Sequence, residues 1–269
     1  MTRATTPPVA LTVAGTDSGG AAGVAADLTT FAAAGCHGAC VVTAVTAQDT
    51  TGVRTVHPVP LPVVADQLDA VLEDLPVAAA KTGMLASAEA VALVARRLHG
   101  VPLVVDPVLV ATSGAVLGDH DVVRAYLDLL LPVATVVTPN PAEARTLTGH
   151  GGPPSALARE LAALGPAAVV TGGPGDEYAG TCTDWLALPG EPAVRLPHPA
   201  VPTGNDHGTG CTFSAALAAG LARGVGPLQA TRDAAALTTR QLETSKDWRL
   251  GRGRGPVAHT TAPTTGGAA

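Results

Sequence analysis

The segment Gly208-Thr209-Gly210-Cys211 places two glycines, a hydroxyl and a thiol at the start of a run of small apolar residues. The run predicts a helix over 208–222, and these four residues would form its first turn. Unpaired backbone N–H groups at a helix N-terminus favour an anion, and glycine lets a phosphate approach them closely. A thiol there should have a lowered pKa, so we expect Cys211 to be partly a thiolate. The alternative is a tightly packed helical turn that binds no ligand.

A second segment, Asn140-Pro141-Ala142-Glu143, places an amide and a carboxylate three residues apart at the start of a predicted helix. A carboxylate at that position could hold Mg²⁺ directly or through water. The same spacing is that of a capping box, in which both side chains only satisfy the backbone of the helix start. The spacing by itself leaves both interpretations open.

A glycine-rich turn, residues 15–23, links an apolar strand to a helix. Its glycines allow close approach of the backbone to a ligand, although the residue order matches neither a Walker A loop nor a dinucleotide-binding loop. The stretch Asp17-Ser18-Gly19-Gly20 resembles the nucleophile segment of trypsin-like serine proteases. In those enzymes a histidine precedes the serine, whereas no histidine precedes Ser18, so we reject that interpretation.

Short apolar runs alternate along the chain with alanine- and leucine-rich helical patterns. This alternation predicts an α/β fold with three layers, α/β/α, around a mostly parallel central sheet. Ligands bind beyond the carboxyl ends of parallel strands, and Gly15, Gln48, Asp106 and Asn140 follow such ends. The predicted strands are 10–14, 40–45, 103–105, 135–138, 168–171 and a hairpin strand at 183–188; the predicted helices are 21–34, 62–74, 87–99, 120–130, 141–148, 155–164, 208–222 and 227–243.

The chain has 269 residues and no obvious linker, so we expect a single domain over 1–258 and a disordered tail at 259–269. Its net charge of −6 argues against a nucleic-acid or membrane-surface partner, and no apolar run is suited to spanning a membrane. Four scattered cysteines form no disulfide framework, which favours the cytoplasm. The cysteines at 36 and 40 flank His37 but lack the further ligands of a zinc site, and we interpret them as core residues.

Together these segments resemble the hydroxymethylpyrimidine and phosphomethylpyrimidine kinases of thiamine biosynthesis, within the ribokinase-like superfamily. The resemblance runs in family order over nearly the whole chain and rests on ALTVAGTDSGGAAGVAADL at 10–28, VTAVTAQDTTGV at 42–53, KTGML at 81–85, VVDPVLVATSG at 104–114, TPNPAEA at 138–144, HGTGCTFSAAL at 207–217 and GRGPVAH at 253–259. It implies a ribokinase-like fold and a homodimer. It also implies ATP-dependent phosphorylation of 4-amino-5-hydroxymethyl-2-methylpyrimidine and then of its monophosphate to the diphosphate.

The resemblance also implies roles for individual residues. The pyrimidine pocket would be lined by Gly15, Asp27, Gln48, Met84 and Val108, with Gln48 hydrogen bonding to the aminopyrimidine edge. Mg²⁺ and the nucleotide phosphates would be organised by Asp106, Asn140, Glu143 and Thr209, of which Asp106 and Glu143 would be the metal ligands. The transferring phosphoryl group would be stabilised by Gly208, Thr209 and Gly210. Cys211 would sit at the acceptor hydroxymethyl group, as a base or as a positioning residue.

The chain departs from the family pattern at three lysines, where it has Thr29, Thr112 and Thr171. Each missing cation near the phosphates would weaken transition-state stabilisation by roughly a few kcal/mol. Three interpretations follow: a kinase of both steps in which arginine, Mg²⁺ or backbone donors compensate, a kinase of another hydroxymethyl heterocycle such as pyridoxal or pyridoxine, and a non-catalytic sensor that binds a pyrimidine. Retention of the other site segments favours catalysis over sensing.

Overall fold

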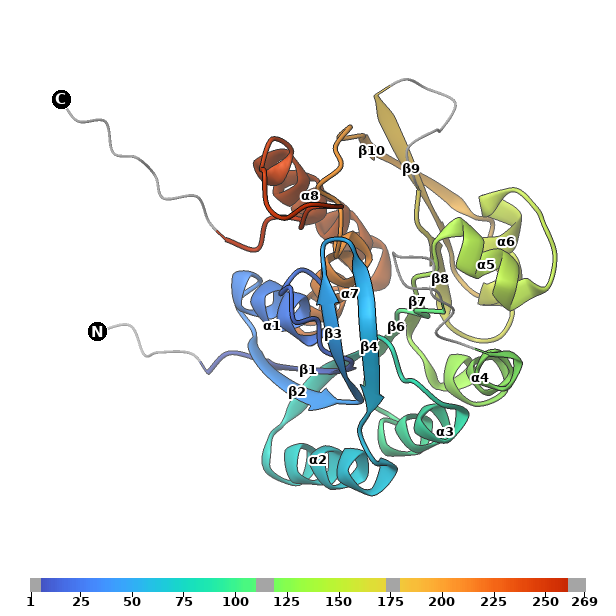
Figure 1. Ribbon diagram of the computed structural model, residues 1–269. Coiled ribbons are helices and arrows are strands. Elements are labelled where there is room, and N and C mark those ends of the chain that lie inside the picture. The colour runs from blue at the N-terminus through green and yellow to red at the C-terminus, as the bar shows by residue number, and fades with distance from the viewer. Residues whose placement is uncertain (1–5, 110–118, 173–179, 261–269) are drawn as a thin grey trace, which may run out of the picture.

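The computed structural model describes residues 6–109, 119–172 and 180–260. They contain an eight-stranded sheet in the order β10-β9-β8-β7-β6-β5-β1-β2 (Figure 1). The strands from β8 to β2 are parallel, and β9 and β10 run antiparallel at one edge. The strands are β1 (Val9–Ala14), β2 (His37–Val42), β5 (Val77–Thr82), β6 (Leu103–Val105), β7 (Val136–Val137), β8 (Ala167–Val170), β9 (Thr181–Ala187) and β10 (Val194–Pro199).

Helices cover both faces of this sheet, which confirms the predicted three-layer α/β/α fold (Figure 1). One face carries α1 (Gly23–Ala33), α7 (Thr209–Ala222) and α8 (Pro227–Ser245). The other carries α2 (Leu61–Asp74), α3 (Ala88–Arg97), α4 (His120–Ala125), α5 (Pro141–Thr148) and α6 (Pro154–Ala162); after α4 the chain continues as a π-helical turn, Tyr126–Leu130, and a 3₁₀ turn, Leu131–Val133. In the described part of the chain no helix is long and apolar enough to cross a membrane.

Four of the parallel strands, β1, β6, β7 and β8, contribute side chains to two hydrophobic cores. In β1, Leu11 and Val13 belong to the core under α2 to α6, whereas Ala10 belongs to the core under α1, α7 and α8. Successive side chains of a strand point to opposite faces, so a strand covered on both sides is expected to be mostly apolar. The uniformly apolar runs in the sequence reflect this double burial.

A separate two-stranded hairpin stands over the carboxyl ends of the parallel strands (Figure 1). It consists of β3 (Ala44–Asp49) and β4 (Gly52–Pro58), which pair antiparallel. The predicted single strand at 40–45 is therefore wrong, because the chain leaves the sheet at Thr43. The apolar run continues across that point because β2 packs in the sheet and Ala44, the first residue of β3, is buried, whereas Val45 is exposed on the hairpin.

Two sheet strands, β5 and β10, have sequences that predict no strand. β5 is rich in alanine and contains Lys81, whereas strands are usually recognised by β-branched and aromatic residues. β10 contains two prolines, which interior strands rarely tolerate. The sheet accepts these two prolines because β10 is its edge strand.

Candidate active site

A cavity of about 1150 Å³ opens at the carboxyl ends of the parallel strands, between the hairpin and the start of α7. Residues that follow five different parallel strands line it, namely Gly15, Gly83, Asp106, Thr138 and Thr171. This placement confirms that the chemically informative residues gather where the strands end. The volume exceeds that of a pocket for one small molecule and suits a nucleotide beside a second ligand.

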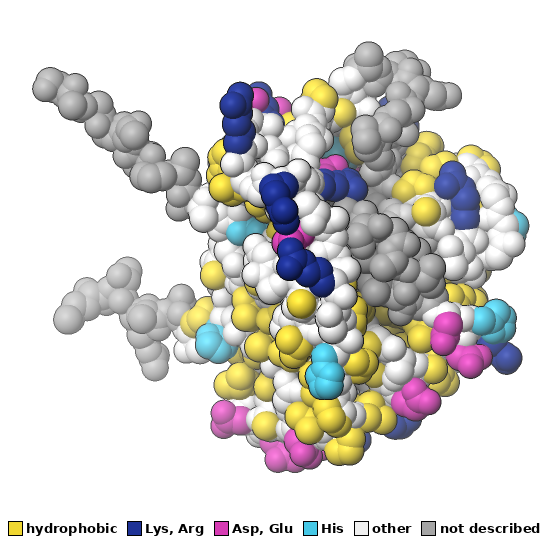
Figure 2. Space-filling model, viewed as in Figure 1, with side chains coloured by type: hydrophobic (Ala, Val, Ile, Leu, Met, Phe, Trp, Pro, Cys, Tyr) yellow, Lys and Arg dark blue, Asp and Glu magenta, His cyan; other side chains and the backbone are white. Residues whose placement is uncertain are grey.

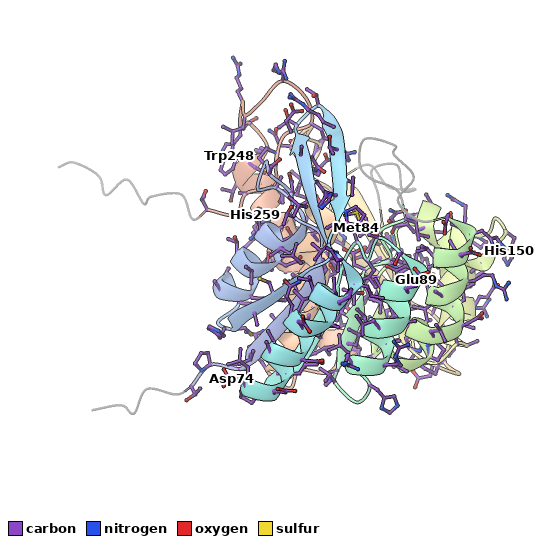
Figure 3. All side chains as sticks on the ribbon, turned by 60° about the horizontal axis from the view of Figure 1, so that its bottom comes forward. Asp74, Met84, Glu89, His150, Trp248 and His259 are labelled. Atoms are coloured by element: carbon purple, nitrogen blue, oxygen red, sulfur yellow. The ribbon has the colours of Figure 1, made fainter. Side chains whose placement is uncertain are left out.

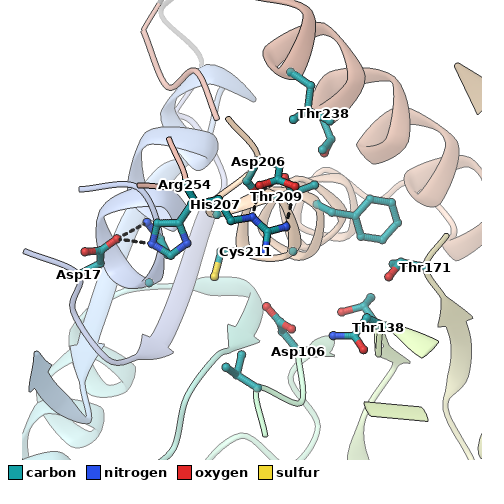
Figure 4. Close-up of a pocket in the computed structure, with 18 of the residues that line it drawn as sticks. Asp17, Asp106, Thr138, Thr171, Asp206, His207, Thr209, Cys211, Thr238 and Arg254 are labelled. Carbon is teal, nitrogen blue, oxygen red and sulfur yellow. Dashed lines mark hydrogen bonds and ion pairs between the residues drawn. The ribbon is translucent and has the colours of Figure 1, made fainter. Parts of the chain in front are cut away.

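The first turn of α7 forms the middle of the cavity wall (Figure 4). Gly208 precedes it with φ +90°, and an added Cβ there would overlap the carbonyl oxygen of Ala21. Within the described residues, the backbone N–H groups of Gly210 and Cys211 have no acceptor. Ser214, one turn further on, donates to Asp106 Oδ2 at 3.1 Å and ties the helix start to the end of β6. The start of α7 therefore offers two unpaired backbone donors to the cavity, as the predicted anion site requires.

Cys211 lies in this turn with its sulfur directed towards the cavity (Figure 4). Burial raises the pKa of the thiol to about 12; the Lys81 ammonium opposes that shift, and the nearby carboxylates of Asp106 and Asp27 add to it. The expected lowering of the pKa is wrong, because desolvation of a thiolate outweighs the field of the helix N-terminus. At neutral pH Cys211 is a thiol that can orient an acceptor hydroxyl.

Replacing Cys211 by alanine should lower kcat for an alcohol acceptor by about tenfold, the size expected for one lost positioning hydrogen bond. The serine variant retains a hydrogen-bonding group at the same place and should recover most of the rate. Steady-state kinetics of the three proteins, together with their thermal unfolding midpoints, would test this. Full activity of the alanine variant would remove the Cys211 side chain from the mechanism.

Two carboxylates, Asp106 and Glu143, face the cavity near each other. Burial and repulsion from Asp106 raise the pKa of Glu143 to about 8, and burial raises the pKa of Asp106. A buried pair of carboxylates that repel each other is a donor set that a divalent cation stabilises. In the part of the chain that the structure describes, no three His, Cys, Asp or Glu side chains converge as a metal site. These two carboxylates could therefore hold a divalent cation only together with further oxygen ligands from a bound molecule or from water.

Asn140 and Glu143 also form the capping box that their spacing predicts. The Asn140 side chain accepts from the N–H groups of Ala142 and Glu143 at 2.9 and 3.0 Å, and Glu143 Oε2 accepts from the Asn140 N–H at 2.9 Å. The capping interpretation is confirmed. Both residues line the cavity as well, so capping positions Glu143 towards it and does not exclude a role with a metal.

One end of the cavity carries the residues expected to bind a pyrimidine. Gly15, Gln48, Met84 and Val108 all line it, and Figure 3 shows Met84 at the centre of the molecule. Gln48 Nε2 lies 2.8 Å from Nε2 of His207, which abuts the anion site. The structure thus places these four predicted residues on the wall of one cavity.

Asp17 organises the glycine-rich turn next to this end. Its carboxylate accepts from the backbone N–H groups of Gly19, Ala21 and Ala22 at 2.8, 3.1 and 2.9 Å, and it lies 3.1 Å from His207 Nε2. Although burial works against the charge, these hydrogen bonds hold the pKa of Asp17 below its usual range. Three amides of the turn are therefore bound to Asp17 and are not available to a ligand.

Ser18 has no nucleophilic arrangement. Its hydroxyl donates to the backbone carbonyl of Gln48 at 2.6 Å and accepts from the Gln48 N–H at 2.8 Å. These bonds hold the hairpin against the glycine-rich turn. The structure thus agrees with the rejection of a serine protease.

Asp27 does not line the cavity, which corrects its expected place in the pyrimidine pocket. It is fully buried beneath the floor, where Lys81 Nζ donates to both of its oxygens at 2.9 Å and Thr12 Oγ1 donates at 2.6 Å. Lys81 Nζ also lies 3.6 Å from Asp106 Oδ2. Burial disfavours the ammonium, but the surrounding carboxylates outweigh it and raise the pKa of Lys81. Asp27 therefore has only an indirect effect on the site, because it holds Lys81 beside Asp106.

The opposite end of the cavity is lined by Thr171, Asp184, His198 and Thr238. His198 Nε2 lies 3.3 Å from Asp184 Oδ2. Burial disfavours the imidazolium, but Asp184 and Cys182 raise the pKa of His198 to about 10. A histidine cation, His198, therefore lies at the end of the cavity where Thr171 replaces the lysine of the family pattern. Thr112, another of the three substituted positions, lies outside the described residues.

The sequence alone indicates no role for Asp17, His198 or Arg254, which all line the cavity. Arg254 lies far along the chain from the other site segments, and only the recurrence of the GRGPVAH segment in the family pattern points to that region. His259, placed by the sequence in a disordered tail, lies 2.9 Å from Thr212 Oγ1 through its Nε2. Residues 261–269 lie outside the described residues.

The fold is similar to that of solved vitamin kinases. The pyridoxal kinase of Bacillus subtilis, in an ADP complex, matches with a TM-score of 0.86 at 32% identity, over 94% of this chain and 98% of that chain. The phosphomethylpyrimidine kinase of Clostridium difficile matches with a TM-score of 0.74 at 32% identity, over 87% and 98%. Fold and cavity together place the chain in the class of ribokinase-like phosphotransferases.

Similarity in sequence narrows this class to one family. The hydroxymethylpyrimidine/phosphomethylpyrimidine kinase of Rhizobium meliloti is 47% identical over 258 residues, which are 93% of this chain and 96% of that protein. The corresponding Mycobacterium tuberculosis kinase is 44% identical over 262 residues, 94% of each protein. The family model for phosphomethylpyrimidine kinase matches residues 17–258. The chain belongs to the phosphomethylpyrimidine kinase family, which confirms the resemblance seen in its sequence.

Proposed function

We propose that this chain transfers the γ-phosphoryl group of ATP to 4-amino-5-hydroxymethyl-2-methylpyrimidine and then to the resulting monophosphate. The observation that carries the proposal is the position of the first turn of α7 between the two ends of one cavity. Phosphoryl transfer requires donor and acceptor to meet at a site of positive potential, and this turn offers unpaired N–H groups there. Relatives at 41–47% identity are named for both phosphorylations, which supports the same pair of reactions here.

The Gln48 end would hold the pyrimidine. The Gln48 amide can donate to a ring nitrogen and accept from the exocyclic amino group, while Met84 and Val108 pack against the ring. The hydroxymethyl oxygen then lies beside Cys211 and attacks the γ-phosphorus. A new P–O bond forms as the bond from the γ-phosphorus to ADP breaks, and the hydroxyl proton passes to a phosphate oxygen. The N–H groups of Gly210 and Cys211 stabilise the oxygens of the transferring group.

ATP would occupy the remaining length of the cavity, towards Thr171 and His198. Solved pyridoxal kinases of Staphylococcus aureus, at 32% identity, hold ADP or AMP-PCP, which supports nucleotide use by this fold. Asp106 and Glu143 would hold Mg²⁺, and Asn140 keeps Glu143 in place through the capping box. When bound, the cation would neutralise part of the negative charge of the phosphates.

A second candidate is a kinase of pyridoxal. It is favoured by the structural likeness to pyridoxal kinases, including one from Staphylococcus aureus that holds pyridoxal, with a TM-score of 0.84 at 31% identity. The donor and acceptor atoms of Gln48 match an aminopyrimidine edge, and the relatives with higher identity are named for the pyrimidine. These observations place pyridoxal second.

The products of one assay separate the candidates. The purified chain, given ATP, Mg²⁺ and the hydroxymethylpyrimidine, should form the monophosphate first and the diphosphate afterwards, resolved by anion-exchange chromatography. Pyridoxal at the same concentration should be a poorer acceptor. ATP binding without turnover of either acceptor would contradict a kinase and favour the non-catalytic sensor.

We further propose a cytoplasmic homodimer. Exposed apolar side chains lie on the hairpin, at Val45 and Val56, and at the start of α2, at Leu61 and Val63. Figure 2 shows hydrophobic side chains gathered over this part of the surface. A surface of this kind is typical of a contact between subunits, which sedimentation velocity would report. All four cysteines are free, as a reducing compartment favours.

A further inference from the structure

Charge is distributed unevenly around the cavity. Six carboxylates of the described chain line it: Asp17, Asp49, Asp106, Glu143, Asp184 and Asp206. Arg254 is the only lysine or arginine among the lining residues that the structure describes. Lys81 lies beneath the floor and is bound to Asp27. Among the described residues, Arg254 is therefore the only lysine or arginine that can contact a phosphorylated ligand in the cavity. The other cation of the lining, His198, lies at the opposite end and is paired with Asp184.

The chain on both sides of Arg254 is anchored. The Gly253 N–H donates to Thr50 Oγ1 in the hairpin turn at 3.1 Å, and the Gly255 N–H donates to the Gly204 carbonyl at 3.0 Å. Gly255 in turn accepts from the His207 N–H at 3.0 Å, next to the start of α7. Figure 4 shows the Arg254 side chain near Thr209 and His207. Its guanidinium group is thus placed beside the start of α7, on the side of the cavity that the hairpin covers.

The partner of Arg254 is Asp206. Two guanidinium nitrogens, Nε and Nη2, donate to its carboxylate, with an Nη2–Oδ2 distance of 2.6 Å. The two side chains are 51% and 25% exposed, so water competes for both and the ion pair contributes little to stability. A phosphate offers the same bidentate geometry as a carboxylate with more negative charge. A ligand phosphate can therefore compete with Asp206 for the guanidinium group, and water can solvate the Asp206 carboxylate that it displaces.

We propose that Arg254 binds the phosphate of the monophosphate acceptor and so determines the efficiency of the second phosphorylation. This inference rests on the proposed function. In the first transfer the acceptor is a neutral alcohol, which gains little from a guanidinium group. In the second, a phosphate must enter a cavity lined by carboxylates, beside ATP, and Arg254 offsets that repulsion. An oxygen of the acceptor phosphate attacks the γ-phosphorus and forms a P–O–P bond while the bond to ADP breaks; Arg254 stays protonated throughout.

The test compares the two acceptors separately in the Arg254→Gln variant. For the monophosphate, kcat/KM should fall by about 10- to 100-fold, the size expected for a lost charge-assisted hydrogen bond. For the alcohol, kcat/KM should change by less than about threefold, because no formal charge on that acceptor is left unpaired. Arg254→Lys retains the charge without the bidentate fork and should fall between the two proteins for the monophosphate.

Arg252→Gln is the matched control. Arg252 lies in the same segment and approaches Asp49 at 3.5 Å, but it does not line the cavity. Both acceptors should retain their wild-type kcat/KM in this variant. Equal losses in Arg252→Gln and Arg254→Gln would show that any change in the segment disturbs the site, and would overturn the proposal.

Asp206→Asn gives an independent readout. It weakens the competing acceptor, while the Asp206 carbonyl still accepts from Thr209 Oγ1. KM for the monophosphate should therefore fall and KM for the alcohol should stay constant. Parallel losses for both acceptors in Arg254→Gln and Asp206→Asn would mean that the ion pair only holds the segment in place, and the proposal would be wrong. If the unaltered chain performs neither transfer, the proposed function fails and this inference fails with it, so the two failures are distinguishable.

Discussion

Replacing Lys81 by methionine should lower the free energy of unfolding by about 3–5 kcal/mol, the cost of leaving a buried charge without its partner. Lys81 and Asp27 are both fully buried, and the ammonium donates to both carboxylate oxygens at 2.9 Å. After the substitution only the Thr12 hydroxyl, at 2.6 Å, remains among the hydrogen-bond donors to Asp27. One neutral donor does not compensate a carboxylate that water cannot reach.

Urea unfolding of Lys81→Met, Asp27→Leu and the double variant would measure this coupling. The double variant removes both charges and should recover much of the stability lost by Lys81→Met, because an apolar pair can replace a buried ion pair. An unfolding free energy for Lys81→Met within about 0.5 kcal/mol of the wild type would contradict the argument.

The double variant should regain stability but not catalytic activity. Lys81 Nζ lies 3.6 Å from Asp106 Oδ2, and its charge lowers the pKa of this cavity carboxylate against the effect of burial. Without the ammonium, Asp106 binds its proton more tightly and is a poorer ligand for a divalent cation. A stable but weakly active double variant is the expected result, and it would separate the structural and the functional parts of the pair.

The α/β/α layers could be predicted because strands buried on both faces have apolar sequences. Runs such as Leu103-Val104-Val105 contain no polar residue, since each face of β6 packs against helices. The sequence of the hairpin indicates its strands less clearly. β4 is mostly exposed and carries Arg54, Thr55 and His57, so its sequence resembles that of a loop. Its pairing with β3 depends on tertiary position over the cavity.

Some residues of the candidate site could likewise be placed from the sequence, and others could not. Asp106 and Asn140 could be placed because they follow predicted parallel strands, and the topology of the sheet brings such positions together. The position of Asp27 and the protonation of Cys211 could not be predicted, because both depend on how completely the surrounding chain excludes water. Arg254 was missed because its approach to the site is set by backbone hydrogen bonds to the hairpin and to residue 204, which no local pattern encodes.

Alanine at position 208 should impair both stability and activity. Gly208 has φ +90°, a conformation that costs alanine about 1–3 kcal/mol, and the new Cβ would overlap the Ala21 carbonyl oxygen. Relief of that overlap must move the start of α7 away from the glycine-rich turn. The N–H groups of Gly210 and Cys211 would then no longer point at the transferring phosphoryl group, and kcat should fall by about 10²- to 10³-fold, as for loss of a preorganised donor.

Alanine at position 210 should have the opposite effect on stability. An added Cβ at Gly210 meets no atom within 4 Å, and the residue lies in the first turn of a helix. Alanine is the better helix former, so Gly210→Ala should unfold at the same or higher denaturant concentration, with a gain of up to about 1 kcal/mol.

The kinetics of Gly210→Ala locate the anion site. If the transferring phosphoryl group lies against the first turn of α7, the new methyl group occupies the space through which its oxygens reach the backbone, and kcat must fall in a protein that is at least as stable as the wild type. Loss of stability would explain a fall in Gly208→Ala but not in Gly210→Ala. Wild-type kcat in Gly210→Ala would mean that the phosphoryl group is bound elsewhere in the cavity, and the role given to this turn would be wrong.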